Sequence, residues 1–322
     1  MIQTKLLVHI AFHYNPDREQ YLFKVLENFK NYEISDIHVI IDTNTEETKE
    51  KLQDFLDTLP FTVDIHTHLN LDHPFNLTWT HREHMLKHVE DYDVFMYIED
   101  DILIPWIAFK GWLAENEAVY KTGKIRGFLR VENPNGDKLY AADYRQPMPA
   151  PVIWTIGSQY YFSPLRPYHA CWVYSRIQMQ EFIKTQAWID GNTGAGGIRE
   201  KAASGMMWVY KFYHRLVLPI NSDGTFPEEV FIYHLPNNYS TDPNTSFAKT
   251  STEELFQGKI KYKNSFDGFM TYYHQLIQEK YLKIIKSYFI KMYQLVVPKK
   301  VREYFKQLLP ESLVTKLSVV RR

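Results

Sequence analysis

Three adjacent carboxylates, Glu99, Asp100 and Asp101, are the side chains in this sequence best suited to chemistry. They end an apolar and aromatic run that begins at Val94, a pattern typical of a strand buried on both faces. Charges at the end of a buried strand are costly unless something pairs with them. We therefore expect a hard divalent cation there, which would in turn hold phosphate. The alternative is a solvated acidic turn, the usual role of acidic clusters.

The elements that must position these acids have the pattern of an α/β protein. Strands are expected at 5–12, 37–41, 61–67 and 93–98, with helical spacing at 21–29 and 46–56 between them. Strand–helix units followed by further strands predict a parallel, doubly wound sheet. Residues 102–106 turn at once into a helix-like segment, so the acids lie at the carboxyl end of their strand. Open α/β sheets bind their ligands at that end.

The polar segment 73–82 begins the next predicted helix. Amide donors and the helix dipole favour anions at a helix N-terminus, so Arg82 is expected to reach a diphosphate. The alternative is an ordinary helix with a surface arginine.

Composition limits the class of protein. The chain has 322 residues, 45% of them hydrophobic, which suits one large domain or a domain with an appendage. A formal net charge of -1 excludes the overall basic field of a nucleic-acid binder. The single cysteine, Cys171, excludes an intramolecular disulfide and indicates a reducing compartment. With no apolar stretch of 18 residues and no signal-peptide pattern, a cytoplasmic protein is expected.

A nucleotide-binding α/β half followed by an apolar strand with an acidic end near residue 100 resembles the GT-A glycosyltransferases. The Glu-Asp-Asp triplet is similar to the variant of the Asp-x-Asp motif in the N-acetylglucosaminyltransferases of N-glycan branching. In those enzymes a short apolar stretch, a proline and an aromatic-bearing helix follow, as Pro105, Trp106 and Phe109 do here. The resemblance covers about residues 5–245.

The resemblance implies a GT-A catalytic domain at 1–250, a Rossmann-like, mostly parallel sheet flanked by helices. Its nucleotide-sugar half would span about 1–105 and its acceptor half about 106–250. Residues 251–322 are expected to form a basic, amphipathic helical extension. From residue 279 onward, the sequence contains eleven basic residues and three acidic ones. We expect 280–322 to meet an anionic membrane surface, where a lipid-linked acceptor would be found. The alternative is that these helices pack on the catalytic domain or on a neighbouring subunit.

The resemblance also implies a metal site. Asp101, with help from His234, would hold Mn2+ or Mg2+ bridging the diphosphate of a nucleotide sugar. Manganese accepts mixed oxygen and nitrogen ligation. A lone histidine is more often structural, and that alternative stays open for His234.

The donor would lie against the same edge of the sheet. Asp100, taken as a catalytic residue, and Glu99 would face the donor sugar and ribose. Asp42, which follows the second strand, is placed to meet the nucleoside. The loop predicted at 13–18, ended by a proline and containing His13, would lie over it.

The acceptor half supplies a candidate base. In inverting GT-A enzymes an acidic residue at the start of the helix after the acceptor loop deprotonates the acceptor hydroxyl, and Glu200 matches that placement. The alternatives are a plain helix N-terminal carboxylate for Glu200, and Asp190 as the base. The glycine-rich stretch 190–197 is expected to be a mobile lid or a surface connector. The aromatic segment 140–167 is either an acceptor-binding surface or a packed irregular insert.

The function expected from these features is metal-dependent transfer of a sugar from a nucleotide sugar to a glycan or lipid-linked acceptor. Inversion follows if Glu200 is the base. Two alternatives are a non-catalytic nucleotide- or carbohydrate-binding protein of the same fold and a nucleotidyltransferase. The latter would usually carry a glycine-rich, basic phosphate loop after its first strand, and residues 13–16 contain none.

Overall fold

The computed structural model describes residues 2–148, 152–164, 167–189, 197–207 and 216–256. The chain divides into two units, Met1–Gly268 and Phe269–Arg322, and every described residue belongs to the first. Most of the expected extension at 251–322, Asp190 and most of the glycine-rich stretch therefore lie outside the described residues.

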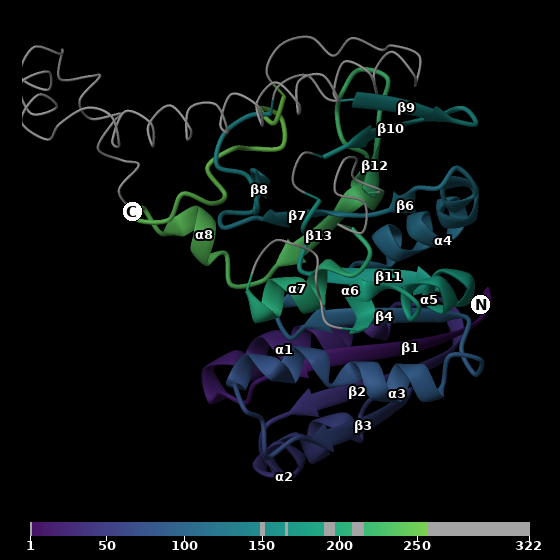
Figure 1. Cartoon of the computed structure of the whole chain (residues 1–322). Coiled ribbons are helices and arrows are strands. Elements are labelled where there is room, and N and C mark those ends of the chain that lie inside the picture. Colours follow the sequence, from purple (N-terminus) through teal and green to yellow (C-terminus); the bar gives the residue numbers. More distant parts are fainter. Residues whose placement is uncertain (1, 149–151, 165–166, 190–196, 208–215, 257–322) are drawn as a thin grey trace, which may run out of the picture. The chain divides into compact units, whose positions relative to one another are not determined.

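A five-stranded sheet with strand order β11-β4-β1-β2-β3 is the centre of the first unit (Figure 1). Its strands are β1 (Ile2–Phe12), β2 (Ile34–Thr43), β3 (Thr62–Thr67), β4 (Val94–Glu99) and β11 (Cys171–Ser175). β1 to β4 are parallel to one another, while β11 runs antiparallel beside β4. The mostly parallel sheet confirms the predicted α/β class.

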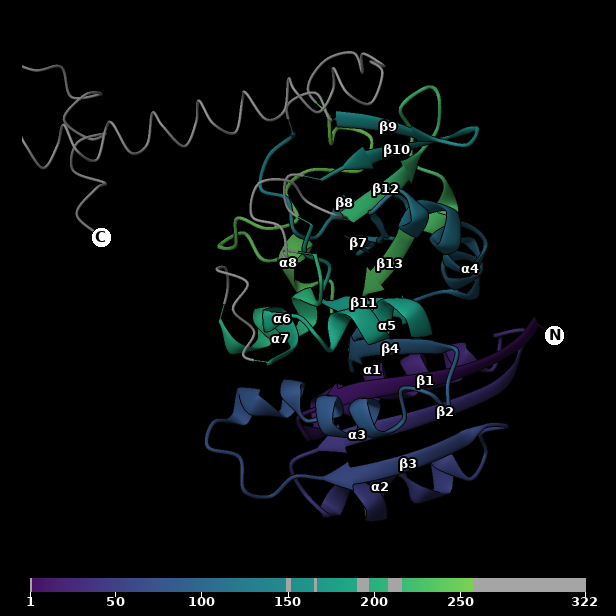
Figure 2. The same cartoon turned by 45° about the vertical axis from the view of Figure 1, so that its right-hand side comes forward.

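Helices cover both faces of this sheet (Figure 2). The α-helices are α1 (Pro16–Phe29), α2 (Glu47–Leu56), α3 (His81–Lys87), α4 (Trp106–Lys121), α5 (Arg176–Phe182), α6 (Gln186–Ile189), α7 (Ile198–Ser204) and α8 (Asn238–Thr241). Two 3-10 helices are η1 (Pro74–Trp79) and η2 (Glu228–Val230). Successive side chains of a strand point to opposite faces. Leu6 and Val8 accordingly pack with Leu26 of α1, whereas Leu7 joins a second cluster with Met85 of α3.

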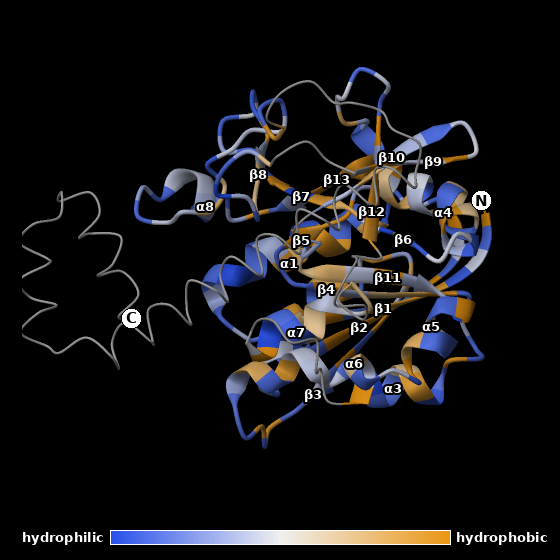
Figure 3. Ribbon diagram, turned by 45° about the horizontal axis from the view of Figure 1, so that its top comes forward, coloured by the Kyte–Doolittle hydropathy of each residue, from blue (hydrophilic) through white to orange (hydrophobic). Residues whose placement is uncertain are grey.

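The first unit also contains two four-stranded sheets, with strand orders β6-β12-β10-β9 and β5-β13-β7-β8. Their strands are β5 (Ile102–Leu103), β6 (Ile125–Arg126), β7 (Leu129–Glu132), β8 (Tyr140–Ala141), β9 (Val152–Ile156), β10 (Gln159–Ser163), β12 (Leu216–Ile220) and β13 (Phe231–His234). Figure 3 shows hydrophobic residues gathered along these strands as well as along the central sheet. The segment 140–167 contributes β8, β9 and β10, and its Tyr144, Ile153 and Phe162 are buried in the core. Of the two expectations for this segment, the packed insert fits, but with regular strands.

One pairing in these sheets positions the functional site. β13 runs antiparallel to β5, with His234 opposite Ile102, and the Leu235 amide donates to the Asp101 carbonyl at 2.9 Å. Since β5 directly follows the acidic triplet, this pairing brings the end of β13 beside those acids.

Two sequence expectations about local structure were wrong. Pro16 does not end a loop but begins α1, and the Asn15 side chain caps that helix by accepting from the Asp17 amide at 3.0 Å. Proline suits the first helical position because the amide it lacks would have no partner there. The single helix expected from residue 73 onward is divided into η1 and α3.

Within the part of the chain that the structure describes, no helix combines the length and the apolar character needed to cross a membrane.

Candidate functional site

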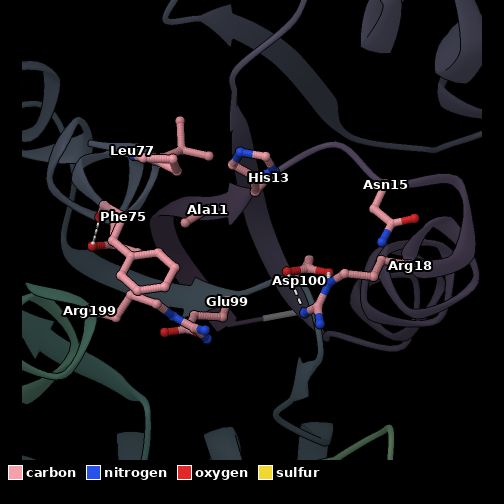
Figure 4. Close-up of a pocket in the computed structure, with 11 residues that line it drawn as sticks. Ala11, His13, Asn15, Arg18, Phe75, Leu77, Glu99, Asp100 and Arg199 are labelled. Atoms are coloured by element: carbon pink, nitrogen blue, oxygen red, sulfur yellow. Dashed lines mark hydrogen bonds and ion pairs between the residues drawn. The ribbon is translucent and has the colours of Figure 1, made fainter. Parts of the chain in front are cut away.

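A cavity of about 320 Å³ lies at the carboxyl ends of the parallel strands (Figure 4). Its walls come from the end of β1, the start of α1, η1, the first turn of α7, and Glu99 and Asp100 of the acidic triplet, whereas Asp101 and His234 do not line it. His13, Glu99 and Asp100, three of the residues predicted for donor binding, line it. The structure therefore brings these three residues together at the edge of the sheet where ligands of α/β proteins bind.

The acidic triplet is buried and paired with arginines. Glu99, Asp100 and Asp101 are each only 4–5% exposed. Arg18 donates from Nε and Nη2 to the two oxygens of Asp100, both at 2.8 Å, and from Nη2 to Asp101 Oδ2 at 2.7 Å. Arg199 pairs with Glu99. A solvated acidic turn is thus excluded, because the carboxylates lie inside the protein with fixed cationic partners.

The crowding of these acids shifts their pKa values in opposite directions. Burial, followed by the neighbouring charge of Asp101, raises the pKa of Asp100 to about 7. Burial also acts to raise the pKa of Asp101, but its bond with His234 and the charge of Arg18 hold that pKa well below its usual range. Asp101 is therefore the carboxylate of this pair that stays ionised at neutral pH.

Asp101 and His234, the two residues predicted to bind a metal ion, lie close to each other. Both are about 5% exposed, and Asp101 Oδ2 lies 3.6 Å from His234 Nε2. On the other ring nitrogen, His234 Nδ1 lies 2.5 Å from Glu132 Oε1. Glu132 also accepts from the Ser240 amide at 2.5 Å. A carboxylate on the second ring nitrogen is the usual way of orienting a metal-binding imidazole.

This pair of donors is one that Mn2+ would accept. One carboxylate oxygen and one imidazole nitrogen are ligands that manganese accepts together, while Mg2+ prefers oxygen alone. No group of three or more His, Cys, Asp or Glu side chains suited to a metal ion occurs among the described residues. The protein would therefore supply two ligands, and substrate oxygens and water the others.

Two arginines and one glutamate of this site were missed from the sequence. Arg18 falls in the segment 13–18 that is expected to be a loop, and no sequence pattern singles out Arg199 or Glu132. One signal was present: three consecutive acids at a buried strand end need cations, and arginines near the starts of helices are candidates.

Glu200 does not line the cavity. Its side chain is exposed, and Oε2 accepts from the Gly197 amide at 2.8 Å, so the carboxylate caps its own helix. The preceding residue, Arg199, is the one that faces the cavity (Figure 4). This geometry matches the alternative of a helix N-terminal carboxylate, and the role of base stays a prediction.

Asp42 also lies away from the cavity lining. Its side chain is 2% exposed and its two oxygens lie 2.6 Å from His9 Nδ1 and 2.8 Å from His68 Nε2. Burial would raise the pKa of Asp42, but the charge of His9 and the bond with His68 lower it well below its usual range. In this geometry both oxygens of the carboxylate are taken up by histidines, and contact with a nucleoside stays a prediction.

Arg82 lies away from the cavity lining, and its contact with a diphosphate stays a prediction. Its guanidinium donates to the carbonyls of Ala187 and Trp188 and lies 3.9 Å from the ring centroid of Trp79. Arg82 is 8% exposed, and its bonds to these carbonyls join α3 to α6. Carbonyl groups at a helix end are acceptors that a buried arginine readily satisfies.

Two further features of the cavity suit a polar ligand with a flat ring. Phe75 of η1 is 47% exposed and lines one wall, with the guanidinium of Arg199 5.5 Å from its ring centroid. Glu99 Oε1 is buried and has no hydrogen-bond partner among the described residues. Because an unsatisfied buried acceptor is costly, it favours a ligand that donates a hydrogen bond there.

No family model matches this sequence, and comparison with curated proteins finds no match. Solved structures similar to the chain include S. aureus TarS 1–349, with 14% identity, a TM-score of 0.39, and coverage of 73% of this chain and 62% of that one. Mannosyltransferase PcManGT from Pyrobaculum calidifontis, solved with GDP-Man and Mn2+, has 10% identity and a TM-score of 0.38, covering 73% and 58%. A 4-diphosphocytidyl-2C-methyl-D-erythritol synthase has 11% identity and a TM-score of 0.37, covering 68% and 89%. The chain thus spans less than two thirds of the first two structures, and the functional conclusion rests on the cavity.

Proposed function

We propose that this chain is a glycosyltransferase of the GT-A type that transfers a sugar from a nucleotide sugar to a hydroxyl of a glycan or lipid-linked acceptor. The observation that carries the proposal is the buried triplet at the carboxyl end of a parallel sheet. Two of its acids, Glu99 and Asp100, line a cavity with two arginines, and the third, Asp101, lies beside a histidine oriented by a further carboxylate.

The chemistry divides among these side chains. Asp101 and His234 would hold the cation, which supplies neutralisation of the charge that develops on the departing nucleoside diphosphate. Glu99 and Asp100 would accept hydrogen bonds from donor hydroxyls, which suits the unpartnered oxygen of Glu99. Phe75 would stack on a flat ring of the donor, because its exposed face lines the cavity.

Glu200 is proposed as the base that takes the proton of the acceptor hydroxyl, which would give inversion at the anomeric carbon. Its place in the turn that carries Arg199 supports this role. Its hydrogen bond to the Gly197 amide would have to be exchanged for the acceptor.

A second candidate is a nucleotide- or carbohydrate-binding protein without catalysis. One observation favours it: among the described residues, the acids that line the cavity, Glu99 and Asp100, both belong to the triplet. This candidate predicts that nucleotide binds but that no donor is hydrolysed with Mn2+.

A thermal-shift screen of UDP-, GDP-, dTDP- and CMP-sugars, with and without Mn2+, tests the proposal. A ligand that binds only the folded state raises stability, by about 2.7 kcal/mol at a hundredfold excess over its Kd. We expect one nucleotide class to stabilise the protein only with Mn2+, and the Asp101→Asn variant to lose that metal dependence. Equal shifts with and without Mn2+ would contradict the metal assignment. Slow donor hydrolysis by the wild type would exclude the non-catalytic alternative.

A further inference from the structure

We propose that Arg18 occupies the cation position of the acidic triplet while the donor is absent, and moves to the donor diphosphate when a divalent cation binds. The inference rests on the proposed function and adds to it a residue that links the binding of cation and donor. The oxygen that would ligate the cation, Asp101 Oδ2, already accepts a hydrogen bond from Arg18 Nη2 at 2.7 Å. The same oxygen lies 3.6 Å from His234 Nε2, the other expected ligand.

Arg18 and a divalent cation cannot both hold this oxygen without strong repulsion. Each is positive, and a shared carboxylate oxygen would place them a few ångströms apart, where like charges repel. Asp101 and His234 are both fixed, with side chains 6% exposed, and Glu132 holds His234 from its far side. The cation can therefore enter only if Arg18 leaves.

Arg18 is the member of this group that is able to move. Its side chain is 32% exposed, against 6% for each of the two aspartates that it contacts. Arg18 lies in the first turn of α1, and its side chain lines the cavity (Figure 4). A rotation about its side-chain bonds would therefore keep the guanidinium inside the site. A long, flexible arginine has many side-chain conformations available for such a change.

The donor offers Arg18 an equivalent second partner. A guanidinium binds carboxylate and phosphate with the same forked geometry, so a diphosphate in the cavity would replace the bonds lost from Asp100 and Asp101. Glu99 lines the same cavity, and its buried Oε1 has no hydrogen-bond partner among the described residues, which is an independent sign that a ligand completes the site. Without the donor Arg18 neutralises the acids, and with it the cation takes over that role.

Arg199 provides a matched control. It too is a partly exposed arginine of the cavity that pairs with a buried acid of the triplet. Its partner is Glu99, which has no part in the pair formed by Asp101 and His234. Removing either arginine takes one positive charge from the site, but only the loss of Arg18 frees the ligating oxygen.

The test measures Mn2+ binding by electron paramagnetic resonance in wild type, Arg18→Gln and Arg199→Gln, alone and with UDP or GDP. We expect nucleotide to tighten Mn2+ binding by wild type about tenfold, and Mn2+ to tighten nucleotide binding by the same factor. Arg18→Gln should bind Mn2+ alone about tenfold more tightly than wild type and lose most of this coupling. Arg199→Gln, which leaves Asp101 Oδ2 paired with Arg18, should gain less affinity for Mn2+ alone than Arg18→Gln does. Arg18→Lys, which keeps a charge, should fall between wild type and Arg18→Gln.

An equal or weaker affinity of Arg18→Gln for Mn2+ alone would overturn the inference. So would an equal gain in both glutamine variants, which would show a general charge effect. Failure of the proposed function has a different signature: Asp101→Asn would bind Mn2+ in the presence of nucleotide as tightly as wild type. Melting temperatures of all variants verify that they fold.

Discussion

At the scale of single residues, His234 lies between two carboxylates that act on different ring nitrogens. Glu132 Oε1 is 2.5 Å from Nδ1, and Asp101 Oδ2 is 3.6 Å from Nε2. The shorter contact fixes the ring, while the longer one is a separation that two ligands of one ion can have once Arg18 has left. The bonds with Asp101 and Glu132 raise the pKa of His234 despite its burial. A proton and a metal ion would thus compete for Nε2.

The Glu132→Gln variant tests this arrangement. The amide keeps the shape of the side chain but weakens the bond that orients His234, so Mn2+ affinity in the presence of nucleotide should fall about tenfold or more. Calorimetric titration of Mn2+ measures the change. Glu117→Gln, at an exposed acid of α4 that pairs with Lys121, is the control and should bind as wild type does. Unchanged affinity in Glu132→Gln would show that His234 has no metal to orient.

Glu200 has two proposed roles with separable consequences. As a base, its replacement in Glu200→Gln should lower the transfer rate about a hundredfold while nucleotide-induced stabilisation is unchanged. As a cap alone, the same change should leave the rate intact and cost about 1 kcal/mol of stability or less. Single-turnover transfer measured beside thermal unfolding distinguishes them, and a wild-type rate would rule out catalysis by Glu200.

At the scale of elements, η1 and α7 form one wall of the cavity because they are tied together. Trp79 of η1 donates from Nε1 to the carbonyl of Ile198 in α7 at 2.9 Å. The guanidinium of Arg82 packs against the Trp79 ring of η1 and donates a hydrogen bond to the Ala187 carbonyl in α6. The contribution of Arg82 is therefore to hold in place the wall that carries Phe75 and Arg199.

The Phe75→Ala variant tests the function of this wall. Since Phe75 is 47% exposed, its loss should change the melting temperature little. Loss of an aromatic stacking partner should weaken nucleotide-sugar binding by about 1 kcal/mol, or about fivefold in Kd. Calorimetry with the best nucleotide of the screen provides the measurement. Ile177→Ala, at an apolar side chain 66% exposed on α5, is the matched control. Equal binding by both variants would show that no ring stacks on Phe75.

At the scale of the whole molecule, buried histidines connect stability to pH. His169 is 2% exposed, and burial lowers its pKa to about 3. Burial also lowers the pKa of His81 well below its usual range. The unfolded chain binds a proton on such a histidine near pH 6.5, whereas the folded chain binds it only at much lower pH. Acid therefore favours the unfolded state across this interval.

We expect the free energy of unfolding to decrease between about pH 6.5 and pH 3, with His169 contributing up to about 1.4 kcal/mol per pH unit. In His169→Gln, which cannot take up this proton, the slope should be shallower over the same interval. Urea denaturation at a series of pH values measures it. His73→Asn, at an exposed histidine that caps η1, should retain the wild-type slope. An unchanged slope in His169→Gln would show that other groups control acid unfolding.

Features of this structure that depend on adjacent residues can be predicted from the sequence, whereas contacts between residues far apart in the sequence cannot. The apolar run from Val94 identifies β4 and the burial of the acids that follow it, because both depend on adjacent residues. Pro16 illustrates a local ambiguity, since proline ends one element as readily as it begins the next. Arg82 illustrates a long-range dependence: its partner carbonyls, at Ala187 and Trp188, lie more than a hundred residues away in sequence, so no local pattern indicates them.

The sequence by itself determined the α/β architecture and the placement of three acids at a strand end, because strand periodicity and helix spacing are local properties of the chain. Only the tertiary structure decided which cations meet those acids and which residues orient His234. Arg18, Glu132 and Arg199 reach the site from separate elements, so their roles depend on strand pairing and helix packing that no local pattern encodes. The pairing of β13 with β5 is the decisive contact, since it places a histidine beside an acid more than a hundred residues earlier in the chain.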